Sequence, residues 1–220
     1  MDKPSPLVIP YLEQLDASNI TDATSILHEH GNRVSVDSVN WESQFPYHPL
    51  TAVYTGHNGS YIFIEFFVRC NFLRAVNTNN NSPVSQDSCV EFFVSPTGDN
   101  FYFNFELNCI GAINASCRSE RHNPTRLNDE QLARIIRYAS CGTRPFNEVE
   151  GLFSWSITMA VPLDLIGLEF KGEPIQIKAN FNKCASATSQ PHYLSWWPID
   201  TPSPDFHQPS FFGPVTLAGK

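Results

Sequence analysis

Two glutamates, Glu91 and Glu106, carry the side chains in this sequence that are best suited to chemistry on a ligand. A period of two over residues 87–93 predicts a strand with Glu91 on one face and apolar side chains on the other. Residues 102–108 follow the same period, with Glu106 and Asn108 opposite the phenylalanines. If these two strands pair, both carboxylates and the Asn108 amide share one surface.

Two carboxylates on one sheet face have three interpretations. They can act as general acid and base in glycoside cleavage, they can hydrogen-bond the hydroxyls of a bound sugar, or they can belong to an ordinary solvated face. The separation of the two carboxyl groups decides between cleavage and binding. Sequence alone does not supply that separation, so all three interpretations stay open here.

Aromatic side chains gather in the last third of the chain, where Trp196 and Trp197 precede Phe206 and His207 in a proline-rich segment. Sugar binding requires flat apolar rings beside a few polar groups. Because neighbouring side chains on a strand point to opposite faces, we expect only one of the two tryptophans to face the core. Ordinary core packing of these rings is the alternative.

Other reactive residue types form no recognisable motif. The histidines lack the spacing of a helical metal site, and neither a phosphate-binding loop nor a nucleophile elbow is present. The chain is long enough to be stable without disulfides, so we expect reduced, mostly buried thiols. The cysteines are Cys70, Cys89, Cys109, Cys117, Cys141 and Cys184.

Strand-like segments separated by Pro, Gly, Asn and Ser predict an all-β fold, an antiparallel β-sandwich in a single domain of residues 1–220. Alternation is clearest at 61–69, 153–161 and 175–182. Two short flanking helices are expected. One covers residues 21–29, and the other follows a capping-box pattern at 128–131 and runs through Ile136 and Ala139 to a stop at Gly142.

A net charge of −8 argues against nucleic acid and anionic membrane surfaces as partners, because both require clustered Lys and Arg. No apolar run approaches the length of a membrane span, so membrane insertion is not expected. No signal peptide is visible, which predicts a cytoplasmic protein if the start is native and a periplasmic or secreted one otherwise. The oligomeric state is not predicted.

An ordered series of segments resembles the family 9 carbohydrate-binding modules, and more closely their single-domain relatives in gut bacteria. These segments lie at 34–41, 61–69, 86–93, 102–111, 155–162, 180–184 and 195–213. The resemblance covers most of the chain. It implies a β-sandwich of the DOMON-like kind, a superfamily that binds sugars or haem, often with structural calcium.

In characterised family members, two tryptophans sandwich a terminal sugar of a cello- or xylo-oligosaccharide, while a glutamate and an arginine bind its hydroxyls. Glu91 matches that glutamate, whereas Glu106 falls at the arginine position. The first tryptophan falls at Val84 or beside it at Ser85, and the second at Phe206. The aromatic clamp of the family is therefore largely replaced.

The leading hypothesis is non-catalytic binding of a mono- or oligosaccharide, with structural calcium as a further expectation and no other cofactor. One alternative is a glycoside hydrolase, of xylanase-related type, that uses Glu91 and Glu106. Another is haem binding through Met159 and a histidine. The residues expected to contact the sugar are Glu91, Glu106, Asn108, Arg74, Lys183, Trp197, Phe206 and His207.

Overall fold

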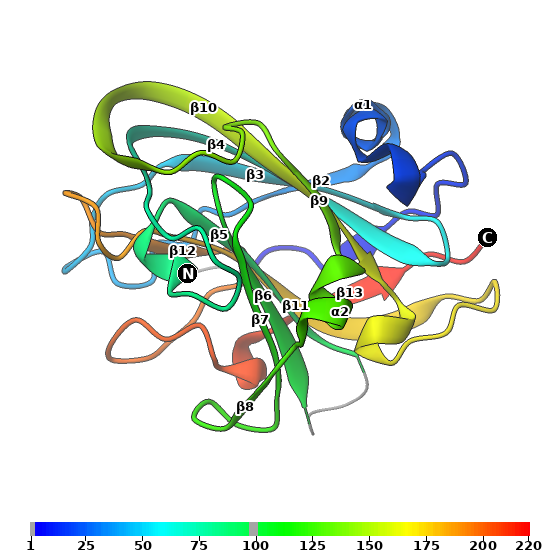
Figure 1. The fold of residues 1–220 in the computed structure, drawn as a ribbon. Helices are drawn as coiled ribbons and strands as arrows, with labels where there is room; N and C mark the ends of the chain where they lie inside the picture. Colours follow the sequence, from blue (N-terminus) through cyan, green and yellow to red (C-terminus); the bar gives the residue numbers. More distant parts are fainter. Residues whose placement is uncertain (1–2, 97–100) are drawn as a thin grey trace.

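The computed structural model describes residues 3–96 and 101–220, which form two β-sheets packed face to face (Figure 1). The larger sheet has the strand order β1 (Leu7–Ile9), β13 (Gly213–Leu217), β11 (Ile175–Cys184), β5 (Cys89–Ser95), β6 (Tyr102–Asn108), β7 (Ile113–Arg118) and β8 (Pro124–Arg126), and β12 (Tyr193–Ser195) also pairs with β11. Apart from the parallel pair β1 and β13, its neighbouring strands are antiparallel. The predicted all-β sandwich is confirmed.

The smaller sheet is antiparallel throughout, with the order β2 (Asn32–Ser35), β3 (Leu50–His57), β4 (Tyr61–Ala75), β10 (Phe146–Pro162) and β9 (Ile136–Ala139). The long strands β4 and β10 pair along most of their length, with two breaks in register near residues 146–153. This sheet closes one side of the core.

The core lies between the sheets and follows the alternation in the sequence. Ile62, Ile64 and Phe66 of β4 are fully buried there, and so are Ile157 and Val161 of β10. Each such side chain contributes about 1.5–3 kcal/mol by leaving water. The predicted inward faces of both strands are therefore confirmed.

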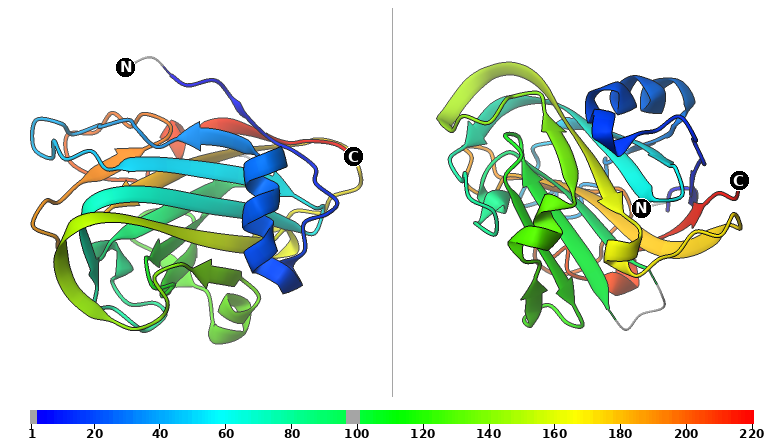
Figure 2. Two further views of the ribbon diagram at one scale, coloured as in Figure 1. Left: turned by 90° about the horizontal axis from the view of Figure 1, so that it is seen from above. Right: turned by 45° about the vertical axis from the view of Figure 1, so that its right-hand side comes forward.

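Helix α1 (Ile20–His30) confirms the first predicted helix and lies across the outer face of the smaller sheet (Figure 2). Its Ala23 and Leu27 pack against Phe63 of β4. The helix ends at Gly31, whose N–H donates to the Leu27 carbonyl oxygen at 2.9 Å. A β-carbon at Gly31 would lie 2.5 Å from that oxygen, so the close approach of the backbone requires glycine.

The second predicted helix is much shorter than its sequence pattern indicated. The capping box is confirmed, because Asn128 Oδ1 accepts from the Gln131 N–H at 2.9 Å and Gln131 Oε1 accepts from the Asn128 N–H at 3.0 Å. However, α2 (Asp129–Ala133) ends early, and residues 136–139 form β9 against β10. Pairing with an available sheet edge outweighs the helical spacing of the apolar residues there. Among the described residues, no helix is long and apolar enough to cross a membrane.

The outer face of the larger sheet is not solvated, as a simple polar sheet face would be. Trp41, Phe206 and Phe212, from loops, pack over Phe93 and Tyr102 of the sheet. This second apolar cluster buries most of the amides and carboxyls that the strands place on that face.

Trp196 and Trp197 are both buried, with ring centroids 5.4 Å apart. The expectation that one of them lies near the surface was wrong. The strand β12 ends at Ser195, so the period of two on which that expectation rested does not apply to the tryptophans.

Candidate functional site

A row of four polar side chains crosses the larger sheet on its outer face. Glu91 of β5 lies directly opposite Glu106 of β6. Asn182 of β11 flanks Glu91 on one side, and Asn114 of β7 flanks Glu106 on the other. The strands that carry Glu91 and Glu106 therefore pair with each other, as the prediction of a shared surface required. This pairing brings the two carboxyl groups onto one surface.

Neighbouring side chains hold both carboxyl groups in place. The Asn104 and Asn114 amides donate to the two oxygens of Glu106 at 2.9 and 3.0 Å. The Asn182 amide donates to Glu91 Oε2 at 3.4 Å, and the Cys184 thiol donates to Glu91 Oε1 at 3.2 Å. The orientation of both carboxyl groups is set before any ligand arrives.

Burial controls the ionisation of the pair. Burial, together with the neighbouring Cys184 and Glu106, raises the pKa of Glu91 well above its usual range. Burial also raises the pKa of Glu106, against the opposing effects of the Asn114 hydrogen bond and the Arg118 charge. Two adjacent carboxylates repel each other strongly away from water, so ionisation of both groups at once is disfavoured.

A pocket of about 500 Å³ opens above this row. Ligand-binding pockets typically have volumes of about 300–1,000 Å³, so the space accommodates a small sugar. The lining residues are Asn81, Ser82, Pro83, Ser85, Glu91, Glu106, Asn114, Arg118, Arg121, Arg126, Cys184, Ser186, Tyr193, Pro204, Asp205, Phe206 and His207.

Four of the predicted site residues line this pocket, namely Glu91, Glu106, Phe206 and His207. The His207 ring lies 3.2 Å from the Tyr102 hydroxyl, measured from Nδ1, and its burial lowers the pKa of His207 to about 4. His207 is therefore neutral at physiological pH and offers a hydrogen-bonding group without charge.

The aromatic part of the pocket is one wall and not a two-sided clamp. Phe206 and Tyr193 both line it, with ring centroids 6.1 Å apart and planes inclined at 59°. At the position of the first family tryptophan, Val84 is fully buried and Ser85 lines the pocket with a small polar side chain. Tyr193 was not among the predicted site residues.

Asn108 and Arg74 do not reach the pocket. The Asn108 amide donates to Asp87 Oδ2 at 2.9 Å and to the Asn77 carbonyl oxygen at 2.7 Å. Arg74 pairs with Asp87 at 2.5 Å. The prediction that they contact a ligand is corrected because the fully buried Asp87 recruits both side chains, and together they anchor the segment 77–88 that forms one pocket wall.

Lys183 and Trp197 also lie away from the pocket. Side chains alternate along β11, so Lys183 points into the core while its neighbours Asn182 and Cys184 face outward. The Lys183 ammonium donates to the Cys184 carbonyl oxygen at 2.7 Å and lies 2.9 Å from His192 Nε2. Trp197 packs in the core. The apolar residues over 175–182 occupy the odd-numbered positions. Continuing this alternation by one residue places Lys183 on the same inward face.

Three arginines that the sequence analysis did not select line the pocket, Arg118, Arg121 and Arg126. Arg118 Nε donates to Asn104 Oδ1 at 2.8 Å, and Arg121 pairs with Asp205 at 2.8 Å. The three arginines within residues 118–126 form a local positive cluster in an acidic chain. This cluster is the sequence feature from which they could have been selected as site residues.

Two observations bear on the alternative activities. Glu91 and Glu106 stand side by side on one strand pair and both line the pocket. Met159, the expected haem ligand, is fully buried among the core side chains between the sheets and does not line the pocket. The expected haem ligand is therefore absent from the pocket lining.

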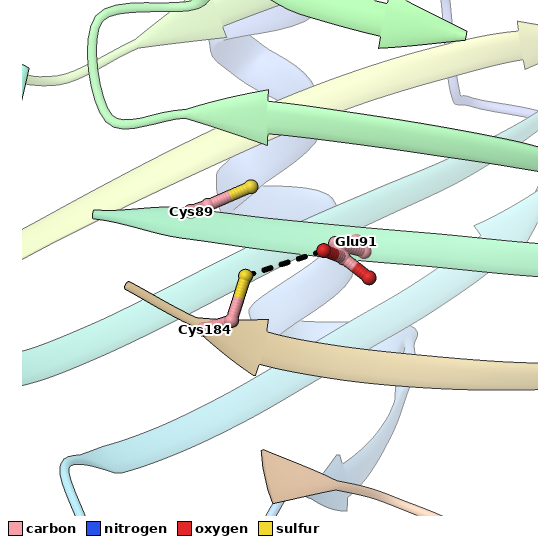
Figure 3. A group of neighbouring side chains, drawn as sticks. All are labelled: Cys89, Glu91 and Cys184. Atoms are coloured by element: carbon pink, nitrogen blue, oxygen red, sulfur yellow. Dashed lines mark hydrogen bonds between the residues drawn. The ribbon is translucent and has the colours of Figure 1, made fainter. Parts of the chain in front are cut away.

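Cys89, Glu91 and Cys184 place one potential metal-ligand atom each within 4.8 Å of one another (Figure 3). Burial raises the pKa of Cys89 to about 11, and a hydrogen bond with Cys89 together with burial raises the pKa of Cys184 well above its usual range. Calcium takes roughly six to eight oxygen ligands, so this sulfur-rich set does not fit the calcium expected from the resemblance. All six cysteines are free thiols, and Cys70, Cys89, Cys109 and Cys184 are buried.

The sandwich fold and a pocket that combines fixed carboxyl and amide groups with an aromatic wall define a ligand-binding module. The sequence model described as carbohydrate-binding family 9 matches residues 22–217, and the chain belongs to this family. The resemblance noted in the sequence is confirmed. No curated protein matches the chain.

Solved structures agree with this assignment. A candidate carbohydrate-binding protein from Bacteroides uniformis ATCC 8492 has a TM-score of 0.91 at 32% identity, over 98% of this chain and 100% of that chain. A family 9 module from Caldicellulosiruptor kristjanssonii has a TM-score of 0.60 both in complex with cellotriose, at 11% identity over 98% and 95% of the two chains, and in complex with glucose, at 12% identity over 98% and 97%. The distant pair shows the shared fold. Together, family and fold support carbohydrate binding without catalysis.

Proposed function

We propose that the pocket above Glu91 and Glu106 binds a mono- or oligosaccharide and leaves it uncleaved. The observation that carries this proposal is the adjacency of a polar floor and an aromatic wall within one cavity of about 500 Å³. Sugars present hydroxyl groups along their edges and apolar C–H groups on their faces, and a pocket with both surfaces matches both.

The floor supplies hydrogen bonds of both polarities. A protonated carboxyl group of the Glu91 and Glu106 pair donates to a sugar oxygen, while an ionised one accepts from a sugar hydroxyl. The amides of Asn104 and Asn114 keep Glu106 in position for this role. Each hydrogen bond contributes about 0.5–1.5 kcal/mol net, and one to an ionised carboxylate contributes about 1.5–3 kcal/mol.

The wall supplies apolar contact. Phe206 and Tyr193 take the place of the paired tryptophans expected from the family, and both rings line the cavity. A one-sided wall contacts one face of a sugar ring, so we expect weaker binding than a two-sided clamp provides. The ligands seen in the family 9 module from Caldicellulosiruptor kristjanssonii, glucose and cellotriose, are the first compounds to test.

Isothermal titration calorimetry with glucose, cellotriose and a panel of other mono- and oligosaccharides tests the proposal. Glu91→Gln should weaken the binding of a neutral sugar about tenfold or more, because the floor loses an acceptor that can become charged. The matched control is Glu173→Gln, since Glu173 is exposed and lines no part of the pocket. Chromatography after incubation should recover the oligosaccharide intact. Absence of heat and of any melting-temperature shift across the whole panel would refute the proposal.

A further inference from the structure

The mouth of the pocket carries a cluster of positive charge on an otherwise acidic protein. Arg118 ends β7, Arg121 follows in the β7–β8 turn, and Arg126 lies in β8 opposite Ser116. All three arginines line the pocket, while the whole chain has a net charge of −8. Local charge of the opposite sign to the whole molecule indicates a site that selects for charge.

Fixed negative groups do not neutralise this cluster. Among the lining residues, Asp205 offsets Arg121 through their ion pair at 2.8 Å. Burial and closeness disfavour the ionisation of both Glu91 and Glu106 at the same time. Within the described residues, the side chains of Arg118 and Arg126 form no ion pair, so both guanidinium charges remain available to an anionic ligand.

The arginines also retain unused donors. Within residues 3–96 and 101–220, the Arg126 side chain makes no hydrogen bond or ion pair, whereas its backbone lies in the β7–β8 ladder. Arg118 uses Nε on Asn104 and Nη1 on the Arg121 carbonyl oxygen, and its Nη2 has no partner in the described part of the chain. A guanidinium group presents paired N–H donors whose geometry matches a carboxylate or a sulfate.

We propose that the pocket selects a carbohydrate that carries an anionic substituent, either a uronate carboxylate or a sulfate ester, held by Arg126 and Arg118. This inference rests on the proposed function and names its ligand class. The sugar ring lies against the Phe206 wall, and the anionic group points to the β7–β8 side of the mouth. Arginine binds a carboxylate and a sulfate through the same paired hydrogen bonds, and the experiment below distinguishes between the two groups.

The test compares acidic and neutral forms of the same sugar by calorimetry. One arm uses trigalacturonic acid against its methyl ester, and the other uses a sulfated disaccharide against its desulfated form. We expect the acidic form to bind at least about tenfold more tightly in one arm, since charge-assisted hydrogen bonds exceed neutral ones by that margin. Raising NaCl from about 0.05 M to about 0.5 M should weaken only the acidic ligand.

Variants locate the effect. Arg126→Gln should remove most of the preference for the acidic form while leaving the melting temperature unchanged, because Arg126 is exposed and unpaired. Arg144→Gln is the matched control, an exposed arginine that lines no part of the pocket. Equal affinity for acidic and neutral forms in both arms, or a preference that survives Arg126→Gln, would overturn the inference. In that case retained binding of neutral sugars would leave the proposed function standing, whereas no binding of any sugar would overturn both.

Discussion

Glu91 and Glu106 face each other across the β5–β6 ladder, and this pairing places two carboxyl groups at the centre of the pocket floor. Because the two carboxyl groups are close together and buried, their ionisation is coupled, so the charge of the pocket floor depends on pH. The two glutamates lie on β5 and β6, which are consecutive in the chain and are connected through residues 97–100, outside the described residues.

The affinity for an acidic sugar should fall as pH rises. Burial raises the pKa of both glutamates, so the pair holds its proton to higher pH than usual and then gains negative charge that repels the ligand. Calorimetry at a series of pH values measures the effect. The double variant Glu91→Gln with Glu106→Gln should remove the pH dependence, and a pH profile unchanged by this variant would contradict the assignment.

Phe206→Leu should weaken sugar binding about tenfold, because leucine keeps most of the apolar volume but lacks a flat ring. Phe206 packs against Trp41 at 5.9 Å between centroids, so the same change should lower the free energy of unfolding by about 1 kcal/mol. The control is Phe211→Leu, in the same apolar cluster but outside the pocket lining. Calorimetry and urea denaturation measure the two effects, and an equal loss of affinity in both variants would argue against a specific role for Phe206.

Asp87→Asn should reduce the free energy of unfolding by about 3–5 kcal/mol, because it leaves the Arg74 guanidinium without its buried partner. Asp87 also accepts from the Asn77 N–H at 2.9 Å and from the Asn108 amide at 2.9 Å. Urea denaturation gives the measurement. Adding Arg74→Met should recover part of the loss, since the unpaired charge is removed; no recovery would mean that the backbone contacts of Asp87 dominate.

Glu65 should make the protein less stable as pH rises from about 4.5 to about 7. Burial beneath α1 raises the pKa of Glu65 to about 7 from 4.5, so the folded state holds a proton that the unfolded chain releases. The His28 Nε2 atom lies 2.9 Å from Glu65 Oε2, which accepts no hydrogen bond. The stability conferred by this proton is fully present below about pH 4.5 and declines up to about pH 7, by up to about 3 kcal/mol in total.

Thermal denaturation at a series of pH values tests this effect. Glu65→Gln should flatten the decline between about pH 4.5 and about pH 7 without abolishing it, because Glu91 and Glu106 titrate in the same direction. Glu173→Gln, on the surface, should leave the profile as it is. If Glu65→Gln and wild type decline in parallel, the carboxyl group of Glu65 is not the titrating group.

Much of the fold and part of the site followed from local patterns in the sequence. Alternation identified the inward faces of β4 and β10, a glycine stop identified the end of α1, and a capping box identified the start of α2. Glu91 and Glu106 could be selected in advance because alternation is local and depends only on the extended geometry of each strand.

Tertiary structure alone decided which polar groups meet a ligand. Asp87 binds Arg74 and Asn108, so neither side chain lines the pocket. Trp197 packs in the core. The β7–β8 hairpin places Arg118 and Arg126 in the lining of the pocket. The end of α2 was decided by an unpaired sheet edge that accepted β9. Each of these outcomes depends on contacts between residues far apart in the chain, and periodicity within a segment carries no information about them.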